Sequence, residues 1–425
     1  MSSASGSSIR GNYIGTRADG SGMLGNGLSG IYLQGGAFNH MIGGTAANQG
    51  NLIVGNGGDG VWVGATAGAG NAILGNTIYS NTGLAIDLGA NGVTANDTND
   101  GDSGANDLLN FPVVTKVVQN GANLDVTLVL DVPAGNYRVE LYQNPAGIDP
   151  ARYGEGQVFL GALSVTSTGT GAQTLTGTLT SVTATSITRI SATTTRDLGA
   201  GTYRSTSEFG PRAGLVVSTT ADTLDGTITS VSALILNPGA DGQISLREAI
   251  TAANATAGTD HIYFDITAAL AGGVHTITLA YDGADAGTTP DALPTITSPV
   301  VINGWTEPDY AGTPIIELNG NNVAGAKGLE LGAGSSGSTI KGLIINRFTS
   351  TGIEISGASN NHTIQGNWIG LKSTGTAAAA NGGKGLYAIN SSGLLIGGTS
   401  AVERNVIAGN AEQGIVFDNV DNSTI

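Results

Sequence analysis

The sequence predicts a mainly-β protein in which two solenoid segments flank an immunoglobulin-like antiparallel β-sandwich, with one short helix. Glycine supplies 69 of the 425 residues, while 5% of the residues are aromatic and 11% are charged. Such a composition favours many tight turns over long helices. Short apolar strands that end in Gly or Gly-Asn recur in the first and last parts of the chain, and the strands between them alternate apolar and polar residues. These observations predict three segments, over 1–112, 113–211 and 212–425.

The first segment, 1–112, is a ladder of short strands. Its central isoleucines Ile31, Ile42 and Ile53 are evenly spaced, and Ile73 follows Ile53 after nearly twice that interval. We therefore expect a solenoid with about two strands per roughly 20 to 22 residues. Asparagines at its Gly-Asn corners are expected to stack and to hydrogen-bond from rung to rung. These asparagines are Asn12, Asn56 and Asn76.

The same ladder returns late in the chain, with corresponding isoleucines at an almost constant offset. The pairs are Ile14 with Ile369, Ile42 with Ile396, and Ile53 with Ile407. These Gly-Asn-Tyr/Trp-Ile-Gly repeats resemble those of bacterial right-handed parallel β-helix proteins, over roughly 1–112 and 300–425. The resemblance implies that 1–112 is the C-terminal part of one β-helix and that 212–425 contains the start of a second.

The middle segment, 113–211, has a different pattern. About seven alternating strands in about 100 residues are typical of an immunoglobulin-like sandwich with one wet face on each sheet. The stretches YGEGQVFLG (153–161) and TSEFG (206–210) resemble a sandwich module that commonly follows such β-helices.

One stretch, SLREAITAANA (245–255), switches to the helical period. Ser245 as N-cap and Glu248 at the third helical position predict a capping box. The apolar residues expected on one helix face are Leu246, Ala249, Ile250 and Ala253.

This stretch resembles the CSLREA-type segment of bacterial extracellular proteins, which caps the N-terminal end of a right-handed parallel β-helix. The leading Cys of that family is Ile244 here, which argues against a thiol role and leaves the cap interpretation in place. An ordinary short amphipathic helix is the alternative.

Charge and cysteine content exclude several functions. The formal net charge is −16, so the backbone of a nucleic acid or an anionic membrane would be repelled and cations are the better expected partners. The absence of cysteine excludes thiol catalysis and Cys-ligated zinc. No apolar run is long enough to predict a membrane span, and the first residues do not form a signal peptide. Either export information lies outside this sequence or the protein is cytosolic. We expect the first, with an extracellular or cell-surface location.

An acidic, turn-rich run over 90–110 holds the candidate metal ligands. Carboxylate and amide oxygens on a flexible loop suit calcium. The spacing does not fit an EF-hand, because Gly101 occupies the fifth position from Asp97, where a ligand is required. Calcium binding and a solvated acidic turn are the two alternatives. The candidate calcium ligands are Asp97, Asp100, Asp102 and Asp107.

Catalysis needs converging charged groups, and the best candidates are Glu330 and Glu354. Their spacing along the chain suits successive rungs, and Lys341 lies between them in sequence. Each also occupies the outward position of an alternating strand, where a charge is simply solvated. We therefore predict no catalytic residues and expect that the chain is not an enzyme.

Histidine and tryptophan give weaker signals. The four histidines show no ligand spacing, which predicts no metal centre among them. Tryptophan can stack on sugar rings, but Trp62 and Trp368 lie inside apolar strands and are interpreted as core residues.

The predicted function is structural: a repeat unit of a bacterial surface protein that forms a stiff stalk, fibre or adhesin scaffold. Its expected partner is a second copy, joined head to tail through the Ile9 and Ile425 ends, and environmental glycans are candidate ligands. Nucleic acid and membrane insertion are not expected, and calcium is the candidate cofactor. The alternatives are a polysaccharide-active β-helix lyase or hydrolase and a carbohydrate-binding module.

Overall fold

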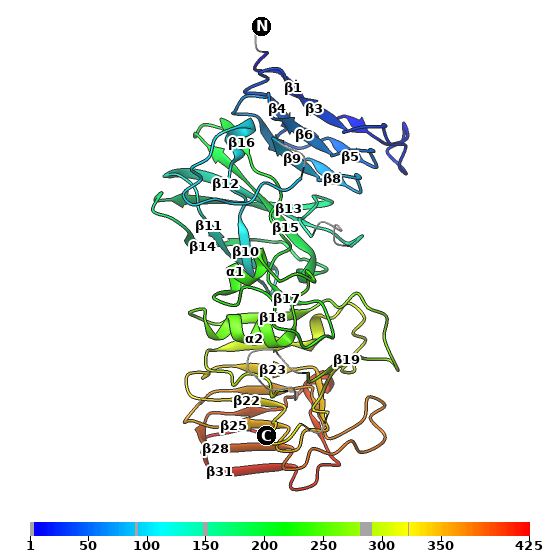
Figure 1. Ribbon diagram of the computed structural model, residues 1–425, viewed down its shortest axis with the longest axis vertical. Coiled ribbons are helices and arrows are strands. Elements are labelled where there is room, and N and C mark those ends of the chain that lie inside the picture. Colours follow the sequence, from blue (N-terminus) through cyan, green and yellow to red (C-terminus); the bar gives the residue numbers. More distant parts are fainter. Residues whose placement is uncertain (1–3, 90–91, 148–151, 281–290, 322) are drawn as a thin grey trace. The chain divides into compact units, whose positions relative to one another are not determined.

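The computed structural model describes residues 4–89, 92–147, 152–280, 291–321 and 323–425, and it divides into two compact units, 1–213 and 214–425. The chain is mainly β (Figure 1). Its helical elements are α1 (Val231–Leu236), α2 (Leu246–Asn254), and the 3-10 turns η1 (Ala105–Leu108), η2 (Ile187–Arg189), η3 (Gly304–Thr306) and η4 (Ala401–Glu403).

The first unit begins with three parallel sheets of three strands each. Their strand orders are β1 (Ser8–Ile9), β4 (Met41–Gly43), β7 (Ala72–Leu74); β2 (Tyr13–Ile14), β5 (Leu52–Val54), β8 (Thr77–Tyr79); and β3 (Ile31–Leu33), β6 (Val61–Gly64), β9 (Ile86–Gly89). Each strand pairs with the strand three places later, and three successive strands, one from each sheet, are called a coil below.

The even strand spacing expected from the isoleucines does not hold along the whole ladder. Ile42 pairs with Ile73 and Ile53 pairs with Ile78, so the second pair spans a shorter stretch of chain than the first. Ile73 and Ile78 therefore lie on strands that follow one another closely. The interval between strands varies because the three strands of one turn of the ladder are joined by corners of unequal length.

Asparagines do stack at the corners of these coils, but in two columns. In one column, the backbone and side-chain amides of Asn12 donate to Asn51 Oδ1, and those of Asn51 donate to Asn76 Oδ1, at 2.9 to 3.0 Å. Asn76 Nδ2 donates in turn to the carbonyl of Ile42. The predicted rung-to-rung bonding of Asn12 and Asn76 runs through Asn51. The second column is Asn26, Asn56 and Asn81.

Two antiparallel sheets complete the first unit. Their orders are β10 (Val113–Asn120), β11 (Asn123–Leu130), β14 (Gln173–Leu179); and β13 (Val158–Ser167), β12 (Gly135–Gln143), β15 (Ile190–Asp197), β16 (Tyr203–Thr206). Strand β11 alternates half-buried and buried residues along its whole length, as the sequence pattern predicts for a strand with one wet face. Side chains from both sheets share one apolar core, whereas Tyr142 and Phe209 pack into the core of the parallel sheets.

Two buried carboxylates lie where these parts of the first unit meet. Glu208 is 2% exposed and accepts hydrogen bonds from the backbone amides of Leu88 and Thr94. Burial raises the pKa of Glu208 to about 7, although those two hydrogen bonds act against the rise. Burial likewise raises the pKa of Asp87 to about 6, against the hydrogen bond from the Gly92 amide.

These carboxylates predict that the first unit loses stability as the pH rises from 5 to 8. Both pKa values lie above those of the unfolded chain, so the folded state binds more protons in this range and unfolding becomes easier as they leave. Because a tenfold change in proton affinity corresponds to about 1.4 kcal/mol, Glu208 alone accounts for a loss on the order of 3 kcal/mol. Hydrogen exchange of peptides from 1–213 in urea at pH 5 and pH 8 measures this loss of stability. The free energy of unfolding should change less with pH in Glu208→Gln than in the parent chain. An equal change in both proteins would show that Glu208 does not cause the pH dependence.

The second unit consists of three longer parallel sheets. The first is β17 (Leu215–Val217), β18 (Asp260–Phe264), β20 (Val300–Asn303), β23 (Thr339–Lys341), β26 (Thr363–Gln365), β29 (Leu395–Ile396). The second is β19 (His275–Thr278), β21 (Ile316–Asn319), β24 (Leu343–Asn346), β27 (Trp368–Ile369), β30 (Val406–Ile407). The third is β22 (Leu329–Leu331), β25 (Ile353–Ile355), β28 (Leu386–Ser392), β31 (Ile415–Asp421), visible as successive rows in Figure 1.

The internal repeat found in the sequence matches the strand register of both units. Ile14 pairs with Ile53 in the first unit, and their counterparts Ile369 and Ile407 pair in the second. The two ladders therefore present the same residues at the same positions of a coil.

Helix α2 has the predicted capping box. The Ser245 hydroxyl accepts from the Glu248 amide at 3.1 Å, and the Glu248 carboxylate accepts from the Ser245 amide at 2.9 Å. The helix contacts β17 and β18 at one edge of the six-stranded sheet. The expectation of one short helix is too low, because α1 also forms, with Ser230 as its N-cap. Its run VSALIL is mostly apolar, so periodicity alone does not separate a short helix from a strand.

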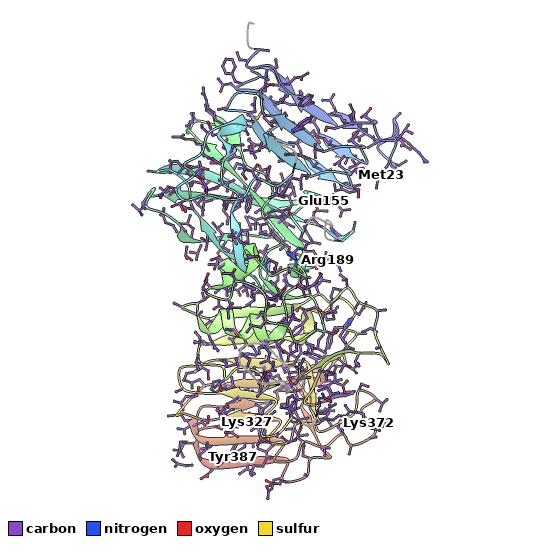
Figure 2. The ribbon with its side chains drawn as sticks, viewed as in Figure 1. Met23, Glu155, Arg189, Lys327, Lys372 and Tyr387 are labelled. Carbon is purple, nitrogen blue, oxygen red and sulfur yellow. The ribbon has the colours of Figure 1, made fainter. Side chains whose placement is uncertain are left out.

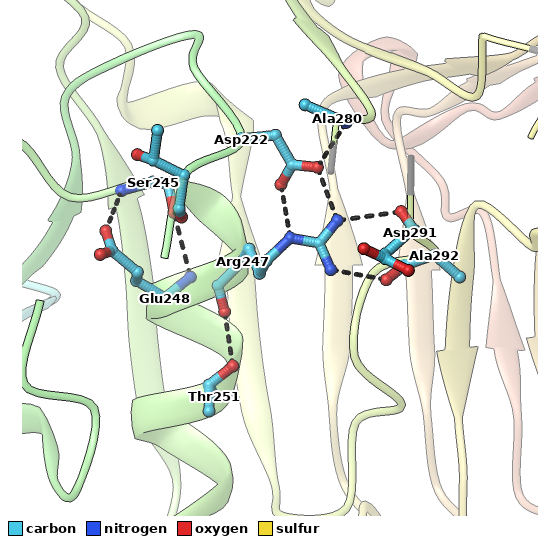
Figure 3. A network of polar contacts seen from close by, with 9 residues as sticks. Asp222, Ser245, Arg247, Glu248, Thr251, Ala280, Asp291 and Ala292 are labelled. Carbon is cyan, nitrogen blue, oxygen red and sulfur yellow. Dashed lines mark hydrogen bonds and ion pairs between the residues drawn. The ribbon is translucent and has the colours of Figure 1, made fainter. Parts of the chain in front are cut away.

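A buried ion pair links α2 to segments that precede and follow it in the chain (Figure 3). Arg247 is 2% exposed, and its Nε and Nη2 atoms donate to the two carboxylate oxygens of Asp222 at 3.0 and 2.6 Å. Its guanidinium also donates to the carbonyls of Asp291 and Ala292 at 2.9 and 2.7 Å. Arg247 thus satisfies acceptors from two segments that are distant from the helix in sequence.

Candidate functional site

A strip of polar side chains runs along the four-stranded sheet of the second unit. Glu330 on β22 pairs in register with Glu354 on β25, which pairs with Tyr387 on β28. Each is half-buried between two buried apolar residues of its own strand, because side chains alternate across a strand and the apolar neighbours face the core. The predicted placement of Glu330 and Glu354 on successive rungs is confirmed.

Lys327 joins the two carboxylates of this strip. Its Nζ lies 2.8 Å from Glu330 Oε1 and 2.8 Å from Glu354 Oε1. Burial acts to lower the pKa of Lys327, but the hydrogen bonds and charges of the two glutamates outweigh it and raise that pKa. The Thr295 hydroxyl donates to the other oxygen of Glu330 at 3.1 Å. The ammonium group of Lys327 therefore holds the carboxylates of Glu330 and Glu354 close together.

Lys341 does not belong to this strip, contrary to the expectation from sequence. It lies on β23 in the six-stranded sheet, with its Nζ 4.7 Å from the centre of the Trp305 ring. Lys341 lies between the two glutamates in sequence but not in space, because successive strands of one coil belong to three different sheets. Lys327 shortly precedes β22 and is the basic group that reaches both carboxylates.

Tyr387 extends the strip with an aromatic ring. The Nζ of Lys384 lies 5.2 Å from the centre of this ring and also pairs with Glu412 Oε2 at 2.7 Å. The Tyr387 hydroxyl donates to Asp418 Oδ2 at 3.2 Å. Figure 2 shows Lys327 and Tyr387 along the same sheet of the second unit. An aromatic face and two carboxylates thus follow one another on consecutive strands.

The equivalent sheet of the first unit carries a pair of stacked aromatic rings on neighbouring strands. Tyr32, which corresponds to Tyr387 in the internal repeat, stacks on Trp62 with ring centres 4.3 Å apart and planes 14° from parallel. Tyr32 is 44% exposed. The interpretation of Trp62 and Trp368 as core residues is wrong, because each is a half-buried residue beside buried apolar ones.

The acidic loop brings together three of the four predicted calcium ligands. Carboxylate oxygens of Asp97, Asp100 and Asp102 all lie within 4.8 Å of one another. Asn110 braces the loop: its side chain accepts from the Asp97 amide, and its own amide donates to Asp100 Oδ1 at 2.7 Å. Asp107 is not in this group. Its carboxylate accepts from Ser205 and lines a separate pocket of about 600 Å³.

Mutual repulsion is visible in the pKa values of this loop. Burial, followed by the charges of the neighbouring aspartates, raises the pKa of Asp100 to about 6 against the hydrogen bond from Asn110. Burial and the charge of Asp97 also raise the pKa of Asp102. A cation among the three carboxylates would relieve this repulsion.

Calcium is therefore still the predicted ligand of this loop, and adding it is expected to raise the melting temperature of the first unit. A ligand at about 100 times its dissociation constant stabilises the folded state by about 2.7 kcal/mol. Differential scanning calorimetry with calcium and with EDTA measures the shift. Asp102→Asn should abolish it, while Asp19→Asn, in an exposed turn outside this loop, should keep it. Identical curves with calcium and with EDTA exclude the site.

One histidine lies among acidic groups that sequence spacing does not reveal. Atoms of His275, Glu307 and Asp309 lie within 4.8 Å of one another, a grouping that the spacing of the histidines in the sequence does not predict. The histidine is on β19, and the two carboxylates are in the turn that follows η3. The histidine is far from both carboxylates along the chain, and this spacing matches no common ligand motif.

No family model matches the chain, and no curated protein matches it. A solved structure described as the catalytic domain of a GH87 alpha-1,3-glucanase D1069A in complex with tetrasaccharides is similar at 11% identity, with 73% of each chain covered and a TM-score of 0.16. That structure is a catalytic domain, and the prediction that the chain is not an enzyme is not kept. So low a TM-score assigns neither fold nor activity to this chain. None of the helices in the described ranges is long and apolar enough to cross a membrane.

Proposed function

We propose that the parallel sheets of both units are coils of a right-handed parallel β-helix and that the antiparallel sheets form an immunoglobulin-like sandwich. The β-helix is supported by the strand order, in which each strand of a parallel sheet pairs with the strand of the next coil. The sandwich is supported by the two antiparallel sheets, which share one apolar core. We propose that the CSLREA-type segment, which consists of α2 and its flanking residues, caps the parallel β-helix of the second unit. An acidic chain without cysteine that carries this segment suits a bacterial cell surface or the extracellular space.

On this scaffold, we propose that the strip of Glu330, Glu354, Tyr387, Lys327 and Lys384 binds a polysaccharide. The observation that carries the proposal is the register of Glu330, Glu354 and Tyr387 on three consecutive strands. Parallel strands repeat every ~4.8 Å, so the strip offers regularly spaced hydrogen-bonding groups to a regularly repeating ligand. Tyrosine supplies an apolar face for a sugar ring, and the carboxylates and ammonium groups meet its hydroxyls.

A neutral glycan fits the strip better than a polyanion does. Four carboxylates lie along it with two lysines, so its net charge is negative. They are Glu330, Glu354, Glu412 and Asp418, with Lys327 and Lys384.

Affinity electrophoresis in gels containing dextran, laminarin or polygalacturonate tests the binding. The chain should be retarded by a neutral glucan, and Tyr387→Ala should restore free migration. Thr339→Ala, a half-buried residue of β23 in another sheet, is the matched control and should be retarded like the parent chain. Free migration in all three gels, or equal retardation of Tyr387→Ala, rules out the strip.

Glycoside hydrolysis is a second candidate function, favoured by one observation. Glycosidases use two carboxylates that flank the scissile bond. Glu330 and Glu354 are two neighbouring carboxylates, since an oxygen of each lies 2.8 Å from the same Lys327 Nζ. The assay measures new reducing ends from the polysaccharide that binds. Release that disappears in both Glu354→Gln and Glu330→Gln supports hydrolysis; binding without release leaves glycan binding as the function.

A stiff scaffold is compatible with both activities. Successive coils joined by main-chain hydrogen bonds form a rod whose length grows with the number of coils. The structural role proposed for this chain is therefore to hold the glycan-binding strip on a rigid support.

A further inference from the structure

The cluster of His275, Glu307 and Asp309 combines a nitrogen donor with two carboxylates. His275 is 1% exposed and Glu307 is 3% exposed, while Asp309 lies at the surface. All three belong to the second unit, and none lies on the polar strip. The cluster is thus closed on the side of the histidine and open on the side of Asp309.

His275 lacks the hydrogen bonds that a buried imidazole normally makes. Neither of its ring nitrogens has a hydrogen-bond partner among the described residues. Its Nε2 lies 3.7 Å from Glu307 Oε1, which is too long for a hydrogen bond. A buried polar group without a hydrogen-bond partner destabilises the folded state, so the two unsatisfied nitrogens of His275 point to a ligand that the ring would bind.

Glu307 and Asp309 are held in place by the turn that carries them. The second oxygen of Glu307 accepts from the Ile266 amide at 3.0 Å, which leaves Oε1 directed toward the histidine. Its own carbonyl accepts from the Tyr310 amide at 2.9 Å, which closes a turn around Pro308 and Asp309. Proline in this turn fixes the backbone between the two carboxylates.

We infer that His275, Glu307 and Asp309 bind a divalent transition-metal ion of the zinc class. Tetrahedral zinc with bonds of about 2.0–2.2 Å places neighbouring ligand atoms roughly 3.3–3.5 Å apart, so the 3.7 Å separation needs only a small contraction. A metal would accept a lone pair from the imidazole, whose two ring nitrogens lack hydrogen-bond partners among the described residues. An imidazole ligand disfavours calcium and magnesium, which take oxygen donors.

Two further features suit metal binding. Exposure of Asp309 leaves a route for the ion and a position for water. Three protein ligands with a solvent-facing fourth position are the arrangement of an open zinc site.

Zinc retention by the full chain tests the inference. After incubation with zinc and gel filtration, elemental analysis should find one zinc per chain at neutral pH. Cobalt loading should give visible d–d absorption. Asp309→Asn, at an exposed position, should weaken zinc binding by more than about tenfold, and His275→Gln should abolish it together with the cobalt bands.

His362→Gln is the matched control, because His362 is fully buried and bonds Ser359 at 2.8 Å outside the cluster. It should retain one zinc. Circular dichroism of each variant separates lost binding from lost folding, and Asp309→Asn provides a readout that does not perturb the core. Absence of zinc from the parent chain, or binding by Asp309→Asn and His275→Gln equal to that of His362→Gln, overturns the assignment.

Discussion

Replacing Arg247 by leucine is expected to lower the free energy of unfolding of the second unit by about 3–5 kcal/mol. The change leaves the buried carboxylate of Asp222 without the guanidinium that neutralises it. It also removes the donor to the carbonyls of Asp291 and Ala292. Breaking a buried ion pair from one side costs far more than the pair itself contributes, since a desolvated charge remains.

Urea unfolding followed by hydrogen exchange of peptides from 214–425 measures this loss. The double variant Arg247→Leu with Asp222→Leu should recover part of it, because no buried charge then stays unpaired. Lys384→Ala, which breaks an ion pair at the surface, should leave unfolding unchanged. A loss in Arg247→Leu no larger than in Lys384→Ala would show that the buried pair does not hold α2 in place.

The second large effect is expected in the asparagine column of the first unit. Asn76 is 2% exposed, and its side chain accepts from both amides of Asn51 and donates to the Ile42 carbonyl. Asn76→Ala removes the partner of the buried Asn51 backbone amide and the side-chain donor to the Ile42 carbonyl, while Asn51 Nδ2 keeps its bond to the Ile9 carbonyl. An orphaned buried polar group costs about 1–3 kcal/mol. We expect the unfolding free energy of the first unit to fall by about 2–4 kcal/mol after partial relaxation.

Asn26→Ala is the control for that experiment, because Asn26 occupies the exposed end of the neighbouring column. It loses a solvent-accessible hydrogen bond and should unfold at nearly the parental urea concentration. The comparison uses exchange of peptides from 1–213. If the two variants unfold alike, the buried column contributes no more than a surface contact does.

Local patterns in the sequence predict much of this structure. The capping box of Ser245 and Glu248 is encoded within a single helical turn and forms as expected. Glu330 and Glu354 occupy aligned rungs because their strands share the apolar-polar-apolar pattern and lie one coil apart. Such features depend on neighbours in the chain or on one full coil.

Contacts that depend on corner length are not predictable in this way. His275 pairs with Ile316 one coil later, whereas Ile316 pairs with Leu343 after a much shorter stretch of chain. The sequence therefore does not reveal that His275 meets Glu307 or that Lys327 replaces Lys341 beside the glutamates. The sequence signal for Lys327 was its place just before a strand that carries a glutamate.

The strand order of the second unit also bears on how the chain reaches this state. In the described ranges, each strand of its parallel sheets bonds to strands one coil away, so a new coil needs a completed one as a template. Helix α2 with β17 and β18 lies at the N-terminal side of the second unit and forms the edge on which later coils build. Because synthesis releases the N-terminal side first, coils can be added in the order of their emergence. Growth from one nucleus avoids long loop closures at every step except the first.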